Sequence, residues 1–201
     1  MLRTNWTYPL FLPLISLGQL LTYALEMRMR SKLIKSRATL CRLARHLREA
    51  GKEIVFTNGC YDLLHVGHLR CLQSARDQGD CLIVGINSDR SARRYKGRGH
   101  PIVPEAERAE LLAALSCVDK VFIFDDPTVD RLLEEVRPHV YCKGKEYTLR
   151  TLPERNTVKT LGVRFRRVGD PKNHSSTQIV KTITALHGSN RKRVGRGKKR
   201  S

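Results

Sequence analysis

Two kinds of apolar pattern alternate along most of this chain. Short runs of consecutive apolar residues, typical of strands buried on both faces, are separated by segments in which apolar residues recur at helical spacing. The strands that this pattern predicts are 53–57, 81–86, 120–124, 139–142 and 163–168. Because each strand is followed by a helix, the strands are expected to run parallel, joined by right-handed crossovers.

The helical segments lie before, between and after these strands. In the first, Leu33, Ile34 and three later leucines recur at helical spacing among basic residues, and Gly51 is its natural end. In the segment that Pro104 opens, Leu111, Leu112 and Leu115 are expected to face inward. The predicted helices are 31–50, 66–78, one that begins at 104, 129–136, one that follows Pro153 and ends near 161, and 176–186. The sequence therefore predicts an α/β fold, a Rossmann-like, doubly wound parallel sheet of about five strands in a single domain.

Two histidines stand where the first predicted strand gives way to a helix. His65 and His68 are three residues apart, so both imidazoles can lie on one helix face near the free N–H groups of the first turn. Gly67 leaves the backbone open between them. A single histidine near a helix start is more often a cap, but the pair at this spacing favours a triphosphate site. Zinc is not indicated, since no further ligands follow at the required spacing.

Polar residues follow three other predicted strands. Asn87 and Asp89 come after the second, Lys143 after the fourth, and a serine-threonine run at 175–177 after the fifth. Each cluster alone could be ordinary capping. Ligands of doubly wound sheets bind at the carboxyl ends of the strands, so the shared placement of these clusters indicates one nucleotide site.

Charge is concentrated at the two ends of the chain. The net charge is +19 over 201 residues, with +7 in residues 1–50, +8 in residues 181–201 and only +4 between them. A nucleic-acid-binding domain more often carries its charge on the folded body, so no specific nucleic acid is expected as a partner. Residues 188–201 are basic with nothing to bury and are predicted to be a disordered tail, which solubilises or binds RNA or anionic lipid weakly.

The first 30 residues form a separate N-terminal extension. The stretch from 8 to 27 is apolar, but two prolines, a glycine and a glutamine interrupt it. A misassigned translation start and a weak membrane anchor are both open, and the anchor is the less favoured of the two. The six cysteines form no C-x-x-C pair, which favours a reducing compartment and, with it, a cytoplasmic location.

Several motifs resemble those of the cytidylyltransferase-like nucleotidyltransferase superfamily. They are H-x-G-H at 65–68 and S-S-T-x-I at 175–179, joined by F-T-N-G-C-Y-D at 56–62, N-S-D at 87–89, P-x-x-E-R ending at 108, and K-G-x-E-Y at 143–147. Together they are most similar to the adenylyltransferase domain of ADP-heptose synthase. The match spans about residues 51–186, within a domain placed at 31–187. Glu146, where the family usually has aspartate, leaves the sugar-phosphate substrate open.

The resemblance implies a role for each site residue. His65, His68 and Lys96 would act in catalysis. The residues that would bind the nucleotide are Thr57, Asn58, Gly59, Tyr61, Gly67, Asn87, Asp89, Arg108, Lys143, Ser175, Ser176 and Thr177. Magnesium would arrive on the triphosphate rather than in a protein cage.

The expected reaction is transfer of AMP from ATP to a sugar 1-phosphate, with D-glycero-D-manno-heptose 1-phosphate as the favoured acceptor and pyrophosphate as the second product. A CTP-dependent enzyme acting on glycerol 3-phosphate or another small phosphorylated alcohol is the alternative. A noncatalytic protein that binds nucleotide or polyanion is the third. The resemblance also implies a separate sugar kinase and, by analogy, a homodimer.

Overall fold

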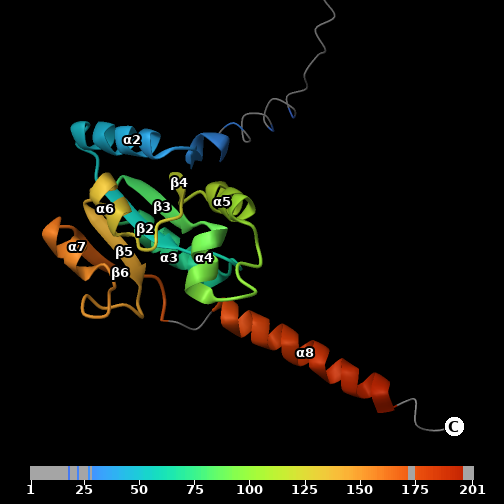
Figure 1. Ribbon diagram of the computed structural model, residues 1–201. Helices are drawn as coiled ribbons and strands as arrows, with labels where there is room; N and C mark the ends of the chain where they lie inside the picture. Colours follow the sequence, from blue (N-terminus) through green and yellow to red (C-terminus); the bar gives the residue numbers. More distant parts are fainter. Residues whose placement is uncertain (1–17, 19–21, 23–26, 28, 172–174, 197–201) are drawn as a thin grey trace, which may run out of the picture.

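A six-stranded parallel sheet forms the centre of the molecule, with helices on both faces (Figure 1). The computed structural model describes residues 18, 22, 27, 29–171 and 175–196. The strands are β1 (Leu33–Ile34), β2 (Ile54–Gly59), β3 (Cys81–Asn87), β4 (Lys120–Phe124), β5 (Val140–Gly144) and β6 (Arg164–Val168). Their order across the sheet is β1-β4-β3-β2-β5-β6. The α/β, doubly wound prediction is confirmed.

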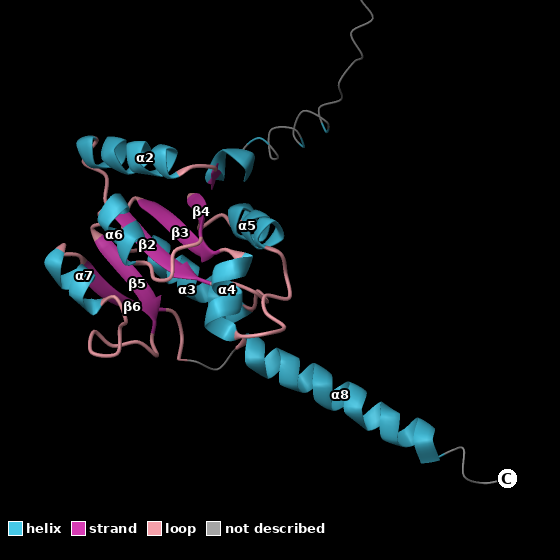
Figure 2. Cartoon of the chain, in the orientation of Figure 1, coloured by secondary structure: helices cyan, strands magenta, loops and turns pink. Residues whose placement is uncertain are grey.

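The helices lie between the strands as the apolar pattern predicts, with one addition. They are α2 (Arg37–Glu49), α3 (Val66–Arg76), α4 (Asp89–Lys96), α5 (Glu105–Ala114), α6 (Asp130–Val136), α7 (Arg155–Thr160) and α8 (Ser176–Arg196). Helix α4 was not among the predicted helices, because half of its residues are basic and it carries almost no apolar stripe. In Figure 2, α3 and α4 lie near the point where α8 leaves the body of the fold.

The prediction of one helix over 31–50 is wrong at its start, and this error accounts for the sixth strand. Leu33 and Ile34 form β1, which pairs with Val121 and Phe122 at the edge of the sheet. Helix α2 begins only after Ser36, whose side chain accepts a hydrogen bond from the Thr39 amide. The N-cap therefore outweighs the helical spacing of the apolar residues.

The two faces of the sheet bury different residues of each strand. On one face, side chains such as Ile54 and Phe56 of β2 pack beneath α2, α6 and α7. On the other face, Val55 packs with α3 and α5. Alternation of this kind explains why the strands read as continuous apolar runs, since both faces are covered.

Helix α5 turns a different face to the sheet than its leucines suggest. Arg108, Ala109 and Leu112 are buried, whereas Leu111 is 48% exposed and the prediction that it faces inward is wrong. The small alanines lie against the sheet. Close packing therefore decides which residues of α5 face inward, and these are not simply the largest apolar ones.

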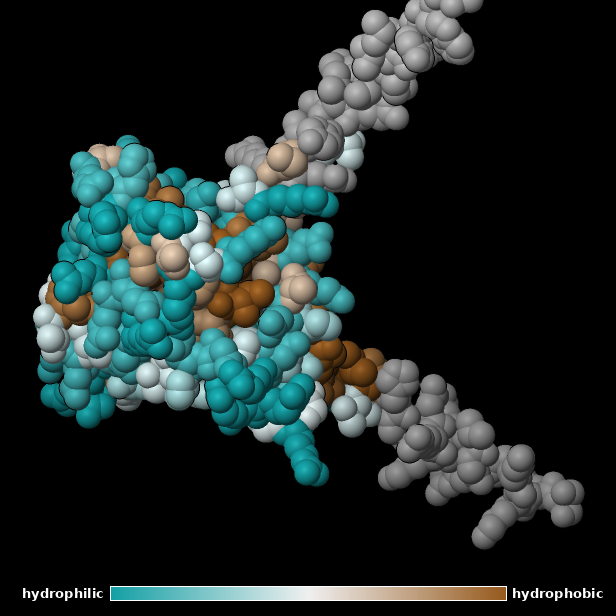
Figure 3. Space-filling model, turned by 45° about the horizontal axis from the view of Figure 1, so that its top comes forward, coloured by the Kyte–Doolittle hydropathy of each residue, from teal (hydrophilic) through white to brown (hydrophobic). Residues whose placement is uncertain are grey.

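Helix α8 is longer than predicted. It runs to Arg196 and so includes residues 188–196, which the composition assigned to a disordered tail. Lys and Arg are good helix formers and are favoured near a helix C-terminus, so a basic composition does not by itself end a helix. Apolar surface is visible where α8 leaves the body (Figure 3). Ile183 of this helix is 49% exposed.

The N-terminal extension lies largely outside the described residues. Within the part of the chain that the structure describes, no helix combines the length and apolar character needed to cross a membrane.

Candidate active site

A pocket of about 480 Å³ opens at the carboxyl ends of five of the six strands. Residues 57–59 of β2, Asn87 of β3, Phe124 of β4, Lys143 of β5 and Val168 of β6 all line it. The sheet order reverses between β2 and β5, because β3 and β4 lie on one side of β2 whereas β5 and β6 lie on the other. Crevices at such a reversal are the usual ligand sites of this architecture.

The histidine pair forms one wall of the pocket at the start of α3. His65 is the N-cap residue, with an extended backbone, and its ring stacks on that of His68 with centroids 3.8 Å apart. Tyr61 packs against His68 at 5.3 Å. The Nδ1 atom of His68 is buried and has no hydrogen-bond partner among the described residues. A buried ring nitrogen without a partner is an exception, since most buried polar atoms form at least one hydrogen bond.

His68 is held in its neutral form. Burial lowers its pKa to about 4, and the neighbouring His65 and Lys96 shift it in the same direction. A neutral imidazole carries one N–H and one lone pair, so at neutral pH His68 offers a single donor rather than a charge. An approaching phosphate would favour the protonated form and raise this pKa.

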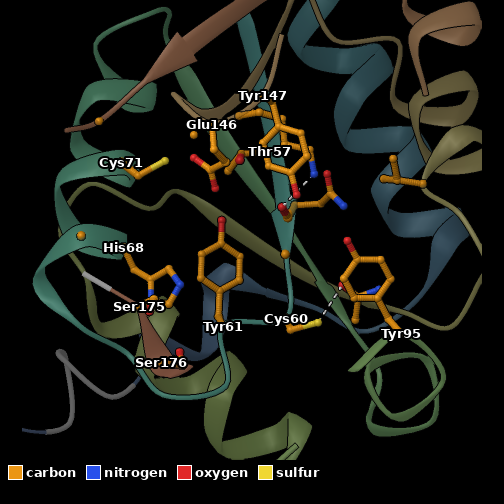
Figure 4. A pocket seen from close by; sticks show the side chains of 18 of the residues that line it. Thr57, Cys60, Tyr61, His68, Cys71, Tyr95, Glu146, Tyr147, Ser175 and Ser176 are labelled. Atoms are coloured by element: carbon orange, nitrogen blue, oxygen red, sulfur yellow. Dashed lines mark hydrogen bonds between the residues drawn. The ribbon is translucent and has the colours of Figure 1, made fainter. Parts of the chain in front are cut away.

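The turn that joins β2 to α3 is shaped by Gly59 and Tyr61. Tyr61 has φ +48°, a left-handed conformation that few residues other than glycine adopt, and its side chain is 7% exposed. A Cβ on Gly59 would lie 3.2 Å from the Tyr61 ring, so glycine leaves the room that the ring occupies. Burial raises the pKa of Tyr61 well above its ordinary value. In Figure 4 the Tyr61 ring stands between His68 and Cys60.

The start of α8, marked by Ser175 and Ser176, lies beside His68 (Figure 4). Ser175 caps this helix, since its hydroxyl accepts a hydrogen bond of 3.1 Å from the Gln178 amide. The Ser176 hydroxyl donates instead to the Leu63 carbonyl, which ties the helix to the turn before α3. Thr177 is exposed and lines the pocket. The starts of α3 and α8 therefore direct two positive helix ends at the same space.

A second part of the pocket contains a buried ion pair. Lys143 Nζ lies 3.6 Å from Glu154 Oε1, and the side chains are only 12% and 5% exposed. Tyr141 donates a hydrogen bond to Glu154, and its hydroxyl lies 2.6 Å from Asn58 Oδ1. Lys143 also donates to the Asn58 carbonyl at 3.3 Å. Burial lowers the pKa of Lys143, while Glu154 opposes that shift.

Acidic and aromatic side chains surround this ion pair. Glu146 lies next to Thr57 and Tyr147 in Figure 4, and both glutamate and tyrosine line the pocket. A Cβ on Gly144 would overlap the Glu146 carboxylate, so glycine is needed for the carboxylate to lie where it does. Burial and a hydrogen bond with Tyr95 raise the pKa of Tyr147 to about 12. This end of the pocket thus offers one cation, two carboxylates and aromatic walls.

The structure brings most of the predicted site residues to the pocket. These are Thr57, Asn58, Gly59, Tyr61, His65, Gly67, His68, Asn87, Lys96, Lys143, Ser175, Ser176 and Thr177. The pocket also includes residues that sequence reasoning missed, chiefly Glu154 and Tyr95. Tyr95 could have been found from its place one residue before Lys96, but Glu154 lies in no motif and carries no local signal.

Arg108 and Asp89, which were expected to bind the nucleotide, do not line the pocket and instead form an ion pair with each other. Arg108 is fully buried, and its guanidinium donates to the carbonyls of Cys60 and Val103 and to the Asp89 carboxylate. These bonds join α5 and α4 to the turn after β2. Arg108 therefore supports the pocket from beneath, because a buried guanidinium requires this full set of acceptors.

The loop between α4 and α5 is held to the same turn by Asp62. Its carboxylate, 1% exposed, accepts hydrogen bonds from the amides of Ile102 and Val103 and contacts His100 Nδ1 at 2.9 Å. Burial acts to raise the pKa of Asp62, but these hydrogen bonds prevail and hold it below its usual range. The turn that carries the histidines is therefore fixed on the side that faces α5.

All six cysteines are free thiols, in agreement with the absence of C-x-x-C pairs. Cys60 and Cys71 line the pocket. Burial raises the pKa of both, that of Cys71 to about 11, so neither is activated as a nucleophile. Among the described residues, no group of three or more His, Cys, Asp or Glu side chains is placed to hold a metal ion.

Comparison with known proteins assigns the part of the chain that contains this pocket to one family. The sequence model described as cytidylyltransferase-like matches residues 56–182. The chain belongs to the cytidylyltransferase-like family. It is a nucleotidyltransferase, and the matched range contains both the histidine pair and the start of α8.

Curated relatives are identical to this chain at close to half of the aligned positions. The bifunctional protein HldE of Geobacter metallireducens is 48% identical over 138 residues, which cover 69% of this chain and 28% of the relative. HldE of Streptomyces coelicolor is 49% identical over 120 residues, covering 60% and 26%. The chain thus spans less than a third of the length of these relatives. The resemblance to the adenylyltransferase domain of ADP-heptose synthase is confirmed.

Solved structures share the fold of this family member. A lipopolysaccharide core biosynthesis protein from Thermoplasma volcanium matches with a TM-score of 0.53 and 24% identity, over 61% of this chain and 100% of that one. A pantoate-beta-alanine ligase from Francisella tularensis matches with a TM-score of 0.50 and 14% identity, over 72% and 68%. At these identities the likeness concerns the arrangement of strands and helices.

Proposed function

We propose that this nucleotidyltransferase transfers AMP from ATP to a sugar 1-phosphate, favouring D-glycero-D-manno-heptose 1-phosphate, with release of pyrophosphate. The observation that carries the proposal is the two-ended pocket. One end gathers the stacked histidines and two helix starts, and the other holds the Lys143–Glu154 pair. A transfer between two phosphorylated substrates requires two such binding regions on either side of the reacting phosphorus.

The histidine end suits the triphosphate. Backbone amides at the starts of α3 and α8, the N–H of neutral His68 and the exposed ammonium of Lys96 converge on it. Donors that are already aimed at the phosphates stabilise the charge that develops as the bond to pyrophosphate lengthens. We therefore assign His65, His68 and Lys96 to stabilisation of the transition state.

The Lys143 end suits the acceptor. An ammonium that is largely shielded from water interacts strongly with a phosphate oxygen, and Glu146 can accept hydrogen bonds from sugar hydroxyls. The phosphate oxygen of the acceptor attacks the α-phosphorus in line. The new phosphorus–oxygen bond forms as the bond to the β-phosphate oxygen breaks, and pyrophosphate departs with that electron pair.

Magnesium is proposed to enter with ATP as part of the substrate complex. The ion keeps several waters and binds phosphate oxygens readily, so it does not need a dedicated set of protein ligands. The donor set of the pocket, which is made of imidazoles, amides and ammonium groups, fits the phosphate oxygens that remain free of the metal. Bound magnesium would neutralise part of the charge on the pyrophosphate leaving group.

A CTP-dependent reaction with glycerol 3-phosphate is the second candidate, and the description of the matching family favours it. The polar groups at the acceptor end favour a sugar instead. Glu146, Tyr95 and Tyr147 offer more hydroxyl partners than a three-carbon alcohol can use. A site that forms hydrogen bonds with the hydroxyls of a longer acceptor binds a shorter one less tightly, because some of its polar groups are left without partners.

Pyrophosphate release by the full chain tests the proposal. ATP and CTP are each paired with heptose 1-phosphate and with glycerol 3-phosphate in magnesium buffer. We expect turnover with ATP and the heptose phosphate, and its loss in the His68→Ala protein. Turnover with CTP and glycerol phosphate alone would keep the mechanism and replace the substrates. The absence of pyrophosphate release with all four substrate pairs would contradict the assigned substrates.

A further inference from the structure

We propose that Glu154 is a positioning residue that keeps Lys143 protonated and aimed at the acceptor phosphate. This inference rests on the proposed function for the identity of the ligand that Lys143 meets. Glu154 lies outside every motif of the sequence, yet its side chain is 5% exposed and contacts Lys143 at 3.6 Å. Its role would be indirect, because it acts on the substrate only through the lysine.

The surroundings of Lys143 explain why it needs such a partner. The side chain lies within an apolar and aromatic environment, with the Tyr141 and Tyr147 ring centroids 5.6 and 5.3 Å from its Nζ atom. Both rings attract the cation weakly, but they do not replace the water that burial removes. Within the described residues, Glu154 is the carboxylate that forms an ion pair with this ammonium.

Other titratable groups face Lys143 from the elements packed around it. They are Glu154 from the turn before α7, Cys60 from the turn after β2, Cys71 from α3, Tyr141 from β5 itself and Tyr147 from the loop after β5. The two thiols remain protonated over the neutral range because burial raises the pKa of each. Glu146 is a second carboxylate at this end of the pocket, but the one that contacts the Lys143 ammonium is Glu154, so the negative charge that holds the proton on Lys143 is assigned to Glu154.

Glu154 is itself held in a defined position. Tyr141 donates to its carboxylate from the neighbouring strand, and the same hydroxyl lies 2.6 Å from Asn58 Oδ1. Leu152, two residues earlier, is fully buried in the core beneath α7. The carboxylate is thus fixed from two sides, and Lys143, which also donates to the Asn58 carbonyl, has little freedom to turn away. A fixed ammonium is more effective than a mobile one, since less ordering is needed when the phosphate arrives.

The test is the Glu154→Gln protein, which keeps the size of the side chain and its acceptor for Tyr141 but removes the charge. Lys143 then loses its proton at lower pH than in the wild type. We expect kcat/KM for the sugar phosphate to be close to the wild-type value near pH 6 and about tenfold lower near pH 9, while the KM for ATP stays unchanged. Glu154→Asp keeps the charge and should retain the wild-type pH profile. Glu134→Gln removes an exposed charge on α6 and serves as the matched control.

A second readout does not depend on turnover. NMR titration of lysine labelled at Nζ, with the Lys143 signal assigned by Lys143→Arg, reports its pKa directly in the wild type and in Glu154→Gln. A lower pKa for Lys143 in Glu154→Gln supports the inference, even if the wild type proves to use different substrates. An unchanged Lys143 pKa overturns it. An unchanged pH profile in an active Glu154→Gln protein overturns it as well.

Discussion

We propose that the two ends of the pocket bind charge by different physical means. At the histidine end, donors come from backbone amides of α3 and α8 and from a neutral imidazole, and the full charge of Lys96 lies on the exposed rim. At the other end, a single ammonium lies in a largely dry environment and depends on Glu154. Helix ends carry fixed dipoles that do not titrate, whereas a buried lysine keeps its charge only while it keeps its proton.

This difference predicts that the two ends respond differently to pH. The triphosphate end should bind its ligand over a broad pH range above the pKa of His68, because little there changes protonation. The acceptor end should set the alkaline limit of the reaction through Lys143. Experiments that disturb one end while leaving the other intact can therefore separate the two.

The largest expected effect is on stability and belongs to the acceptor end. Lys143→Met leaves the Glu154 carboxylate buried without its partner, so we expect the free energy of unfolding to fall by about 3–5 kcal/mol. Adding Glu154→Gln to Lys143→Met removes the unpaired charge and should restore most of that loss. Urea denaturation measures both values. Equal stability of the single and double variants would show that the pair is not coupled in the folded protein.

The next effect is on catalysis and belongs to the histidine end. His68→Ala should lower kcat by about 10²- to 10³-fold, as expected for the loss of one preorganised donor to the transition state. The fold should persist, since the ring lies on the pocket wall rather than in either apolar core. His46→Ala, an exposed change on α2, is the control. A folded His68→Ala protein with full turnover would remove His68 from the mechanism.

The histidine end could be foreseen from the sequence because its parts are local. The H-x-G-H and S-S-T runs each lie at a helix start, and the spacing within one turn already places the side chains together. The apolar runs likewise predicted the five strands from β2 to β6, with bounds that differ from the observed ones by a few residues at most. The apolar pattern did not predict β1, because two apolar residues before a capping serine are equally compatible with a helix.

The acceptor end could not be foreseen in the same way. Asn58, Tyr141, Lys143 and Glu154 come from two strands and a turn, and only the pairing of β2 with β5 brings them together. The burial of Arg108 was hidden for a similar reason. An arginine in a motif suggests phosphate binding, whereas the structure satisfies its guanidinium with two carbonyls and Asp89.

A pH effect on stability comes third. The pKa of His68 is about 4 in the folded protein, below its ordinary value of 6.5, so folding favours the neutral ring. The resulting stabilisation is fully present above pH 6.5 and is lost as the pH falls towards 4. Urea denaturation at a series of pH values should show a shallower loss in His68→Gln than in the wild type over this range. Identical curves would mean that His68 is protonated as easily in the folded chain as in the unfolded one.

The smallest effect concerns the cap of α8. Ser175→Ala removes the hydroxyl that accepts from the Gln178 amide, which should cost about 1 kcal/mol and weaken ATP binding by roughly fivefold. Ser36→Ala removes the equivalent cap of α2, at a distance from the pocket. It should cost a similar amount of stability without changing ATP affinity. Calorimetric titration with ATP distinguishes the two, and equal affinities in both variants would show that the start of α8 does not hold the nucleotide.

The most direct test of the two-ended pocket is NMR on the full chain with labelled histidine and lysine side chains. Each substrate is added alone in magnesium buffer. The account predicts that ATP shifts the His65 and His68 signals and leaves Lys143 nearly unchanged, and that the sugar 1-phosphate shifts Lys143 and leaves the histidines nearly unchanged. If both ligands shift the same set of signals, the pocket has one phosphate site and the assignment of its two ends is wrong.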